Sequence, residues 1–222
     1  MLTLMGRDRT RLEARAQLFS ARAVPVDVGD AESVKGAFSR AVAAGGPVHI
    51  LVNNAGVAAS APFVHTDLSL WTRMLGVNLT GTYLCCREVT AGMLEQGYGR
   101  IVNIASTAGV TGYPYVTAYC AAKHGVVGLT RALALEMART NVTVNAVCPG
   151  YTDTDMVADA VANIVRKTGR TTDAARAELV GRNPQRRLVT PEEVANTALW
   201  LCLPGAEAIT GQAIAVAGGE VL

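Results

Sequence analysis

The sequence has no long apolar run and no strong excess of one charge. No stretch of about 18 uninterrupted apolar residues occurs, which excludes a typical membrane-spanning helix. Arg7, Asp8 and Arg9 stand where a secretory signal would keep its apolar core. The formal net charge is only +2 and the arginines are scattered, so no nucleic-acid surface is expected. We therefore expect a soluble protein that acts on a small molecule, without nucleic-acid or membrane partners.

Cysteine and histidine are too few and too scattered for a disulfide framework or a metal cage. The five cysteines form an odd set without C-x-x-C spacing. This pattern is typical of buried thiols in a reducing compartment and predicts a cytoplasmic location. The three histidines are isolated along the chain, so we expect no metal site.

Short β-rich runs alternate with longer helical segments along the chain. The β-rich runs are apolar on both faces, as in strands of a covered parallel sheet: AVPVDV, VHILVNN, GRIVNIAS, NVTVNAVCPG and QAIAVAGG. The segments between them are long enough for a helix each, with start signals near Asp30 and at Thr190. The pattern predicts an α/β fold with a doubly wound, Rossmann-like parallel sheet, in a single domain over residues 1–222.

The most polar part of the chain is the segment 155–187, with RKTGRTTDAARAEL in its middle. Because it lies between two buried elements, its composition favours a mobile helical flap over a site. An ordinary pair of solvated helices is an equal alternative.

Polar or glycine-bearing residues follow three of the predicted strands. These are Asn53 to Gly56 after the first, Ser106 after the second, and Pro149 and Gly150, with Thr152 and Thr154, after the third. In an open parallel sheet, ligands bind beyond the carboxyl ends of the strands. Taken singly, these residues can equally close a strand or cap a turn.

The segment AYCAAKHGVVGLTRALALEMA reads as a buried helix, yet it contains Tyr119 and Lys123. Residues four apart lie on one face of a helix, so the phenol of Tyr119 and the ammonium of Lys123 are expected to point in the same direction and to lie close together. Ser106 precedes Tyr119 by 13 residues, at the end of a predicted strand, and can reach the same volume. An adjacent ammonium is expected to lower the pKa of the phenol and make it an effective acid or base.

These motifs resemble the short-chain dehydrogenase/reductase family across essentially the whole chain. The resemblance rests on Ser106, Tyr119-x-x-x-Lys123, NNAG at 53–56, VNLTG at 77–81 and PGYTDT at 149–154. It implies that Tyr119 is the general acid in carbonyl reduction and that Ser106 polarises the carbonyl. It also implies that Lys123 binds the nicotinamide ribose, and that Asn78, in a helix kink, holds a water linking Lys123 to solvent.

The same resemblance implies a site for a nicotinamide cofactor. Asp27 and Val28 match positions that contact adenine. The adenosine, ribose and carboxamide positions are matched by Asn53, Ala55, Gly56, Pro149, Gly150, Thr152 and Thr154. Gly6 is followed by Arg7 where an aspartate would repel a 2′-phosphate, so NADP is favoured over NAD.

The family's first strand, its glycine-rich turn and the following helix have no counterpart in this sequence. The opening MLTLMGRDRTRLEA resembles the family's second strand and the helix after it. That first strand lies in the middle of the sheet, so its absence is expected to leave both neighbouring strands unpaired. We hypothesise that roughly 30 residues precede Met1 in the working protein, the length of one strand, turn and helix.

The leading interpretation is an NAD(P)(H)-dependent oxidoreductase that interconverts a ketone and a secondary alcohol. The style of the motifs most resembles the 3-oxoacyl-thioester reductase branch, whose substrate is carried on acyl carrier protein or coenzyme A. One alternative is an NAD-dependent 3-hydroxyacyl-coenzyme A dehydrogenase. Another is a catalytically silent relative that lacks the phosphate loop.

Two further expectations concern surfaces. Tyr113, Tyr115 and Tyr151 flank the expected cleft and are candidates for an apolar pocket. The family usually forms dimers and tetramers through its long helices, here within 68–97 and 119–139, and through the last strand. Candidates for this contact, or for ordinary core, are Leu84, Cys85 and Val89.

Overall fold

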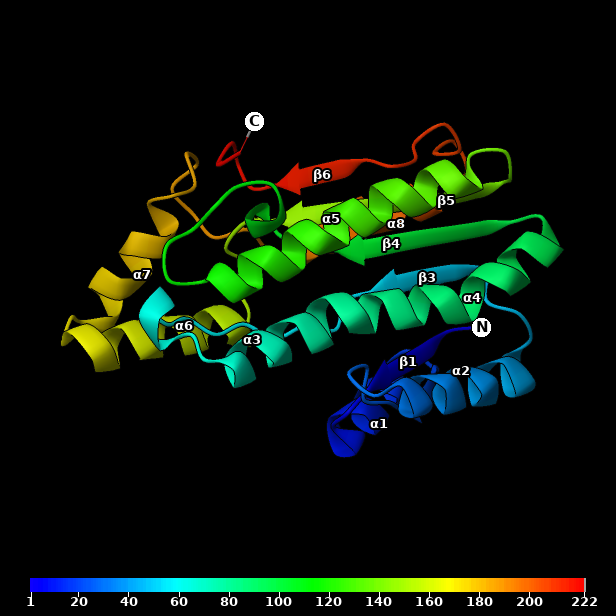
Figure 1. The fold of residues 1–222 in the computed structure, drawn as a ribbon, viewed down its shortest axis with the longest axis horizontal. Coiled ribbons are helices and arrows are strands. Elements are labelled where there is room, and N and C mark those ends of the chain that lie inside the picture. The colour runs from blue at the N-terminus through cyan, green and yellow to red at the C-terminus, as the bar shows by residue number, and fades with distance from the viewer. Residues whose placement is uncertain (222) are drawn as a thin grey trace.

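A computed structural model describes residues 1–221 and contains two parallel sheets. Strands β1 (Thr3–Gly6) and β2 (Arg22–Pro25) pair with each other. The second sheet holds, in spatial order, β3 (Ile50–Asn53), β4 (Gly99–Ile104), β5 (Val142–Pro149) and β6 (Ala213–Val216). All its pairings are parallel, so the carboxyl ends of these strands meet at one edge (Figure 1). The β-rich runs of the sequence are therefore confirmed as strands.

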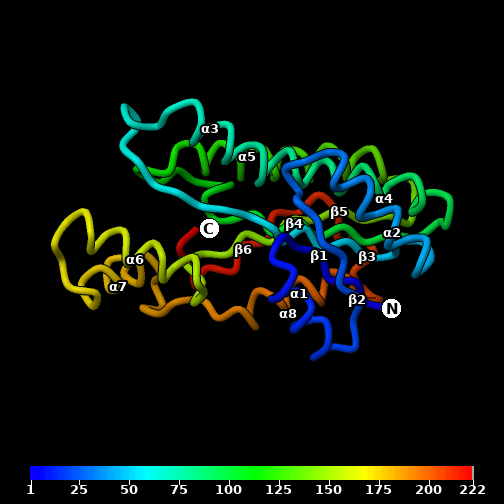
Figure 2. The backbone as a smooth tube through the Cα atoms, turned by 90° about the horizontal axis from the view of Figure 1, so that it is seen from below, coloured from blue at the N-terminus to red at the C-terminus, as the bar shows by residue number. Residues whose placement is uncertain are grey.

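Helices cover both faces of the sheets (Figure 2). One face carries α2 (Ala31–Gly45), α3 (Leu68–Leu75), α4 (Gly81–Gln96) and α5 (Thr117–Met137), and the other carries α1 (Arg9–Leu18) and α8 (Pro191–Cys202). Short turns of helix lie at Phe63–His65, Gly76–Thr80 and Thr107–Gly109. This three-layer arrangement is the predicted α/β architecture.

Two helix starts follow the signals found in the sequence. Asp30 is the N-cap of α2, and its carboxylate accepts a hydrogen bond from the backbone of Glu32. Thr190 caps α8 in a complete capping box with Glu193, and Pro191 occupies the first helical turn. The first backbone N–H groups of a helix have no partner within the helix, and a capping side chain accepts their hydrogen bonds. Because the capping residue lies next to the helix in sequence, the start of the helix can be predicted from local sequence alone.

The main core lies between α2, α4 and the strands. It contains Leu84, Cys85 and Val89, which are 7%, 6% and 3% exposed. Of the two roles that the sequence left open for them, the structure shows ordinary core, because this face of α4 packs on β4 and α2. β4 and β5 are buried almost throughout, as expected for central strands with helices on both faces.

The two sheets are not joined to each other. Among residues 1–221, β1 pairs only with β2, and β3 pairs only with β4. Ile50 and Val52 of β3 are each 46% exposed, unlike the buried residues of the neighbouring β4. The sequence predicted this interruption, since a strand that belongs between β1 and β3 has no counterpart in the chain.

The segment 155–187 forms two helices, α6 (Asp155–Thr168) and α7 (Thr172–Val180), beyond the carboxyl ends of the strands (Figure 1). They share a small apolar cluster that is separate from the main core. Asn163 of α6 donates a hydrogen bond to the hydroxyl of Ser60 at 3.0 Å, which ties the pair to the loop after β3.

The described residues contain neither a membrane-spanning helix nor a cluster of metal ligands. No helix within 1–221 is both long enough and apolar enough to cross a membrane. No group of three or more histidine, cysteine, aspartate or glutamate side chains in that range is arranged to hold a metal ion.

Candidate active site

Ser106 lies just past the end of β4, where it caps the short helical turn Thr107–Gly109. Its hydroxyl oxygen accepts a hydrogen bond from the backbone of Ala108 at 3.1 Å. This turn presses against α5: a Cβ on Gly109 would lie 2.7 Å from the carbonyl oxygen of Lys123. Only glycine permits that approach, and the approach holds the serine beside the part of α5 that carries Tyr119 and Lys123.

Tyr119 and Lys123 occupy successive turns of α5, as their spacing predicted. The Lys123 ammonium nitrogen lies 5.7 Å from the centre of the Tyr119 ring. Lys123 is only 5% exposed, and its Nζ donates a hydrogen bond to the carbonyl oxygen of Ile104 at 2.8 Å. Ile104 ends β4 two residues before Ser106, so the lysine ties α5 to the strand that carries the serine.

Burial dominates the ionisation of this pair. It raises the pKa of the Tyr119 phenol above its ordinary value, and a hydrogen bond with the Ser106 hydroxyl only partly opposes the rise. Burial also lowers the pKa of Lys123 to about 8. The expectation that Lys123 lowers the pKa of the phenol is therefore wrong for the protein alone, because burial raises that pKa and the opposing effect comes from the Ser106 hydroxyl. The phenol keeps its proton at neutral pH.

Asn78 lies in a π-helical turn, Gly76–Thr80, inserted between α3 and α4. The predicted kink is thus a π-turn, a feature often found at functional sites. Its amide pairs twice with the backbone of Val57: Nδ2 donates to the carbonyl oxygen at 2.9 Å, and Oδ1 accepts from the nitrogen at 3.0 Å. A Cβ on Gly56 would lie 2.9 Å from Asn78 Oδ1 and 3.8 Å from Lys123 Nζ, so both side chains converge on this glycine. The predicted water relay between them stays a prediction.

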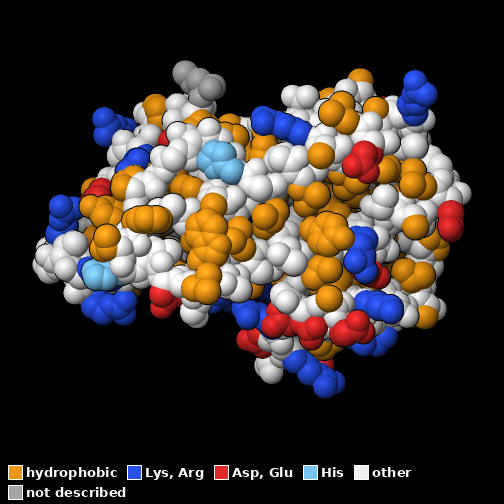
Figure 3. Space-filling model, viewed as in Figure 1, with side chains coloured by type: hydrophobic (Ala, Val, Ile, Leu, Met, Phe, Trp, Pro, Cys, Tyr) orange, Lys and Arg blue, Asp and Glu red, His pale blue; other side chains and the backbone are white. Residues whose placement is uncertain are grey.

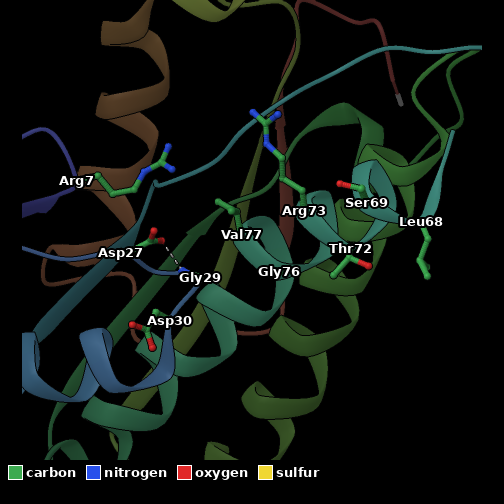
Figure 4. A pocket seen from close by; sticks show the side chains of 10 residues that line it. All are labelled: Arg7, Asp27, Gly29, Asp30, Leu68, Ser69, Thr72, Arg73, Gly76 and Val77. Atoms are coloured by element: carbon green, nitrogen blue, oxygen red, sulfur yellow. Dashed lines mark hydrogen bonds between the residues drawn. The ribbon is translucent and has the colours of Figure 1, made fainter.

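Arg7, Asp27 and Gly29 line an open cleft of about 670 Å³ between the β1 and β2 loops and α3. Figure 4 shows Arg7 reaching into it from one side and Arg73 of α3 from the other. Asp27 Oδ1 accepts a hydrogen bond from the backbone of Gly29 at 2.9 Å, which shapes the loop after β2.

Val28 and the predicted cofactor residues after β3 do not line this cleft. Their contacts are with other parts of the protein. A Cβ on Gly81 would lie 2.9 Å from the carbonyl oxygen of Val28, so the loop after β2 touches the start of α4. Asn53 Nδ2 donates to Asn103 Oδ1 at 2.9 Å, which directs this side chain into the sheet. Ala55 is exposed on the loop that leads to Gly56.

The segment after β5 turns sharply before α6. Thr152 Oγ1 donates a hydrogen bond to the carbonyl oxygen of Gly150 at 3.0 Å, and Thr152 also forms an isolated parallel bridge with Val189. Thr154 Oγ1 donates to the carbonyl oxygen of Thr152 at 3.2 Å, next to the start of α6. Pro149 ends β5, and the segment from Gly150 to Thr154 connects this strand to α6.

Of the three tyrosines expected near the cleft, two meet. The rings of Tyr113 and Tyr151 lie edge to face with centroids 6.4 Å apart. Tyr115 is 63% exposed and its φ of 68° belongs to a turn, so it is a surface residue. For Tyr115, surface packing, the alternative to a role in the pocket, agrees with this exposure.

Sequence reasoning missed Arg73 and Glu220. Arg73 shares the cleft with Arg7 although 66 residues separate them, and no local pattern links the two. Glu220 accepts a hydrogen bond from the Tyr113 hydroxyl at 2.7 Å, across 107 residues of sequence. A charged residue directly after Gly218 and Gly219 was the one signal that could have drawn attention to it.

Comparisons with known proteins agree with this geometry. A family model described as enoyl-(acyl carrier protein) reductase matches residues 1–220. A Streptomyces coelicolor protein named "Putative ketoacyl reductase" is 43% identical over 195 residues, which are 87% of this chain and 75% of that protein. The D-beta-hydroxybutyrate dehydrogenase of Rhizobium meliloti is 39% identical over 175 residues, 78% of this chain and 68% of that protein.

A solved structure shares the fold. The crystal structure of an actinorhodin polyketide ketoreductase with NADPH matches with a TM-score of 0.94 and 38% sequence identity. The match covers 98% of this chain and 86% of that one. The order of the motifs, the fold and these relatives lead to one conclusion: the chain belongs to the short-chain dehydrogenase/reductase family of NAD(P)-dependent oxidoreductases.

Proposed function

We propose that the protein is an NADP(H)-dependent ketoreductase that interconverts a ketone and a secondary alcohol. The observation that carries this proposal is the pairing of a half-buried Tyr119 with a buried Lys123, beside Ser106 at the carboxyl edge of the sheet. A phenol that keeps its proton at neutral pH suits the reduction direction, in which the protein must donate a proton. The names of the ketoacyl reductase and ketoreductase relatives agree with that direction.

The proposed mechanism assigns one task to each side chain. Ser106 Oγ donates a hydrogen bond to the carbonyl oxygen of the substrate and polarises it. A nicotinamide cofactor, held by Lys123 and the segment from Pro149 to Thr154, would supply the hydride to the carbonyl carbon. As the π bond breaks, Tyr119 gives its phenolic proton to the carbonyl oxygen, which completes the alcohol and leaves a phenolate. The Lys123 ammonium stabilises that phenolate, and protons return from solvent by way of Lys123 and Asn78.

The two ends of a nicotinamide dinucleotide fit residues of this chain. Arg7 and Arg73 offer two guanidinium groups to a 2′-phosphate in the 670 Å³ cleft, where Asp27 lies near the expected adenine. At the other end, Lys123 and the segment from Pro149 to Thr154 face the expected nicotinamide. The pyrophosphate between them does not fit, because no glycine-rich turn occurs among residues 1–221 and β1 is not paired with β3.

The substrate class within this proposal is a 3-oxoacyl thioester or a cyclic ketone of similar shape. The rings of Tyr113 and Tyr151 support an apolar or aromatic body next to the reacting carbonyl. The hydroxybutyrate dehydrogenase relative supports the alternative of an NAD-dependent 3-hydroxyacyl-coenzyme A dehydrogenase. The third alternative stays a catalytically silent relative.

A hydride-transfer assay separates these functions. We expect consumption of NADPH with acetoacetyl-coenzyme A or 1-tetralone, and a loss of about 10²–10⁴-fold in kcat for Tyr119→Phe, which removes the proton donor. Tyr115→Phe, a change at an exposed tyrosine, is the matched control and should keep full activity. No turnover of either ketone by a folded wild-type protein, with either cofactor, would support the silent alternative.

The cofactor assignment has its own measurement. Removal of one guanidinium in Arg7→Ala should raise the KM for NADPH about tenfold or more and leave the KM for NADH unchanged. The exposed Arg15→Ala on α1 is the control. A preference for NADH that persists in both variants would favour the dehydrogenase alternative.

The remaining expectations also stay proposals. We place the protein in the cytoplasm on the odd number of cysteines, and we treat 155–187 as a flap because α6 and α7 have their own apolar cluster beyond the sheet edge. We propose a dimer or tetramer through α4 and α5. In Figure 3 apolar side chains gather over these two helices, where Tyr83 is 44% and Leu135 79% exposed. Sedimentation equilibrium measures the assembly directly.

A further inference from the structure

Four segments that are distant in sequence meet beside the proposed active site. They are the loop before α5 with Tyr113, the turn after β5 with Tyr151, the loop after α7 with Arg182, and the segment after β6 with Glu220. The Tyr113 and Tyr151 rings lie edge to face, and the Arg182 guanidinium carbon lies 5.1 Å from the centre of the Tyr113 ring. None of these side chains has a part in the mechanism proposed above.

One oxygen of Glu220 is held tightly. Oε1 accepts a hydrogen bond from the Tyr113 hydroxyl at 2.7 Å. That hydroxyl also contacts Thr107 Oγ1 at 2.9 Å, in the turn that begins directly after Ser106. A carboxylate anchored through one oxygen to a hydroxyl on a packed ring has a defined direction for its other oxygen.

The other oxygen has no partner. Oε2 is buried, and no group among residues 1–221 donates a hydrogen bond to it. It lies against Gly150: a Cβ at that position would be 2.8 Å away. Gly150 belongs to the segment that is expected to face the nicotinamide. A buried carboxylate oxygen without a donor is costly, and such atoms at a site are commonly completed by a ligand.

The charges around Glu220 narrow the kind of ligand. A substrate carboxylate or phosphate next to Oε2 would be repelled by Glu220. The cluster already holds a cation, because the positive charge of Arg182 acts on Tyr151 together with the negative charge of Glu220. A neutral donor completes Oε2 without adding a charge of either sign. The neighbouring side chains Tyr113 and Tyr151 are aromatic, which favours a hydroxyl carried on an apolar or aromatic body.

We propose that Glu220 is a specificity-determining residue that selects ketones carrying a hydroxyl group, by accepting a hydrogen bond from that hydroxyl at Oε2. The proposal rests on the ketoreductase function proposed above and adds the substrate class to it. Tyr113 is a positioning residue here, because it acts through Glu220 and does not touch the substrate hydroxyl.

The test compares ring-hydroxylated 1-tetralones with their methyl ethers, which keep the oxygen but have no proton to donate. In the wild type we expect at least one hydroxy isomer to exceed its methyl ether about tenfold or more in kcat/KM, the range of a hydrogen bond to a charged group. Binding of the same pairs to the protein with NADP⁺, which cannot deliver a hydride to the ketone, is measured by calorimetry. Glu220→Leu should bring the ratio of kcat/KM for the hydroxy compound to that for its methyl ether close to 1.

Matched variants separate this role from a structural one. Glu136→Leu, at an exposed glutamate of α5, should keep the preference. Tyr113→Phe should reduce it, because the carboxylate loses its anchor. If Glu220→Leu fails to fold, Glu220→Gln keeps the size and one acceptor but loses the charge, and it should show a smaller preference than the wild type.

The outcomes distinguish the two proposals. Donor-selective binding that disappears in Glu220→Leu, without turnover of any ketone, would support the role of Glu220 and overturn the ketoreductase function. Turnover of 1-tetralone without any hydroxyl preference in the wild type would overturn the role of Glu220 alone. A change in the KM for NADPH in Glu220→Leu, with the preference intact, would assign Oε2 to the cofactor carboxamide and would also overturn the proposal.

Discussion

The burial of the Lys123 ammonium lowers the stability of the folded protein. It is 5% exposed, and its ammonium makes a single hydrogen bond, to the carbonyl oxygen of Ile104. Burial lowers its pKa from 10.5 to about 8, so the folded protein holds the proton of this lysine less tightly than the unfolded chain does. In the proposed mechanism this buried ammonium stabilises the phenolate of Tyr119.

Replacement of this lysine should therefore stabilise the protein while it inactivates it. Below pH 8 the charged lysine is destabilising in full, and the penalty disappears as pH rises from about 8 to 10.5, because the unfolded chain binds more protons in that window. Lys123→Met should raise the free energy of unfolding by about 1–3 kcal/mol at pH 7, and the difference should shrink towards pH 10. Urea unfolding across this pH range measures it.

The control for this experiment is Lys35→Met, at an exposed lysine of α2. It should change the free energy of unfolding by no more than about 0.5 kcal/mol at any pH. If Lys123→Met were less stable than the wild type at pH 7, the hydrogen bond to Ile104 would outweigh the burial of the charge.

Sequence reasoning at the residue scale succeeded where spacing alone decides geometry. Tyr119 and Lys123 lie one turn apart on one helix, so their convergence follows from the helix repeat. Glu220 and Tyr113 meet across 107 residues, and only the completed fold brings them together. The pKa of Tyr119 was mispredicted for a related reason, since the degree of burial depends on every element packed around it.

At the scale of elements, the backbone edges of β1 and β3 that face each other lack hydrogen-bonded strand partners among the described residues. β1 and β3 each have one edge without a strand partner among residues 1–221, whereas β4 and β5 are paired on both sides. Backbone amides at such edges are not protected by ladder hydrogen bonds.

Hydrogen exchange followed by mass spectrometry should resolve this difference. Peptides covering β4 and β5 should exchange at least about tenfold more slowly than peptides covering β1 and β3, because local opening is cheap at unpaired edges. β6 is an internal control, since it also has only one strand partner, β5. Equal protection of β3 and β4 would show that another segment pairs with β3 in solution.

The elements themselves were largely predictable from the sequence. Strands buried on both faces read as apolar runs, and caps such as Thr190 and Asp30 mark helix starts. The π-turn at Gly76–Thr80 was foreseen only as a kink, from resemblance, because an extra residue in a helical turn leaves no periodic signal of its own. The bounds of α6 and α7 were not predicted, because the polar residues of the segment 155–187 drew attention away from the apolar residues that α6 and α7 share in their own cluster.

At the scale of the whole molecule, the sheet of β1 and β2 is joined to the rest chiefly by helix packing. α2 packs on α4, and Val34 and Phe38 of α2 enter the same apolar core as Leu84. Arg7 follows β1 and Arg73 belongs to α3, so the cleft between them has one side on each of the two parts that no continuous sheet joins. The relative position of the two arginines therefore depends on the packing of α2 on α4.

The π-turn also limits how the chain length can vary. A deletion of one residue within 76–80 would remove the extra residue of the turn and let α3 run into α4 as one regular helix, with Leu84 and Val89 still facing the core. Asn78 would lose the widened turn from which its amide bonds twice to the backbone of Val57. Insertions and deletions should accordingly be tolerated in the surface loops and be absent between residues 68 and 96.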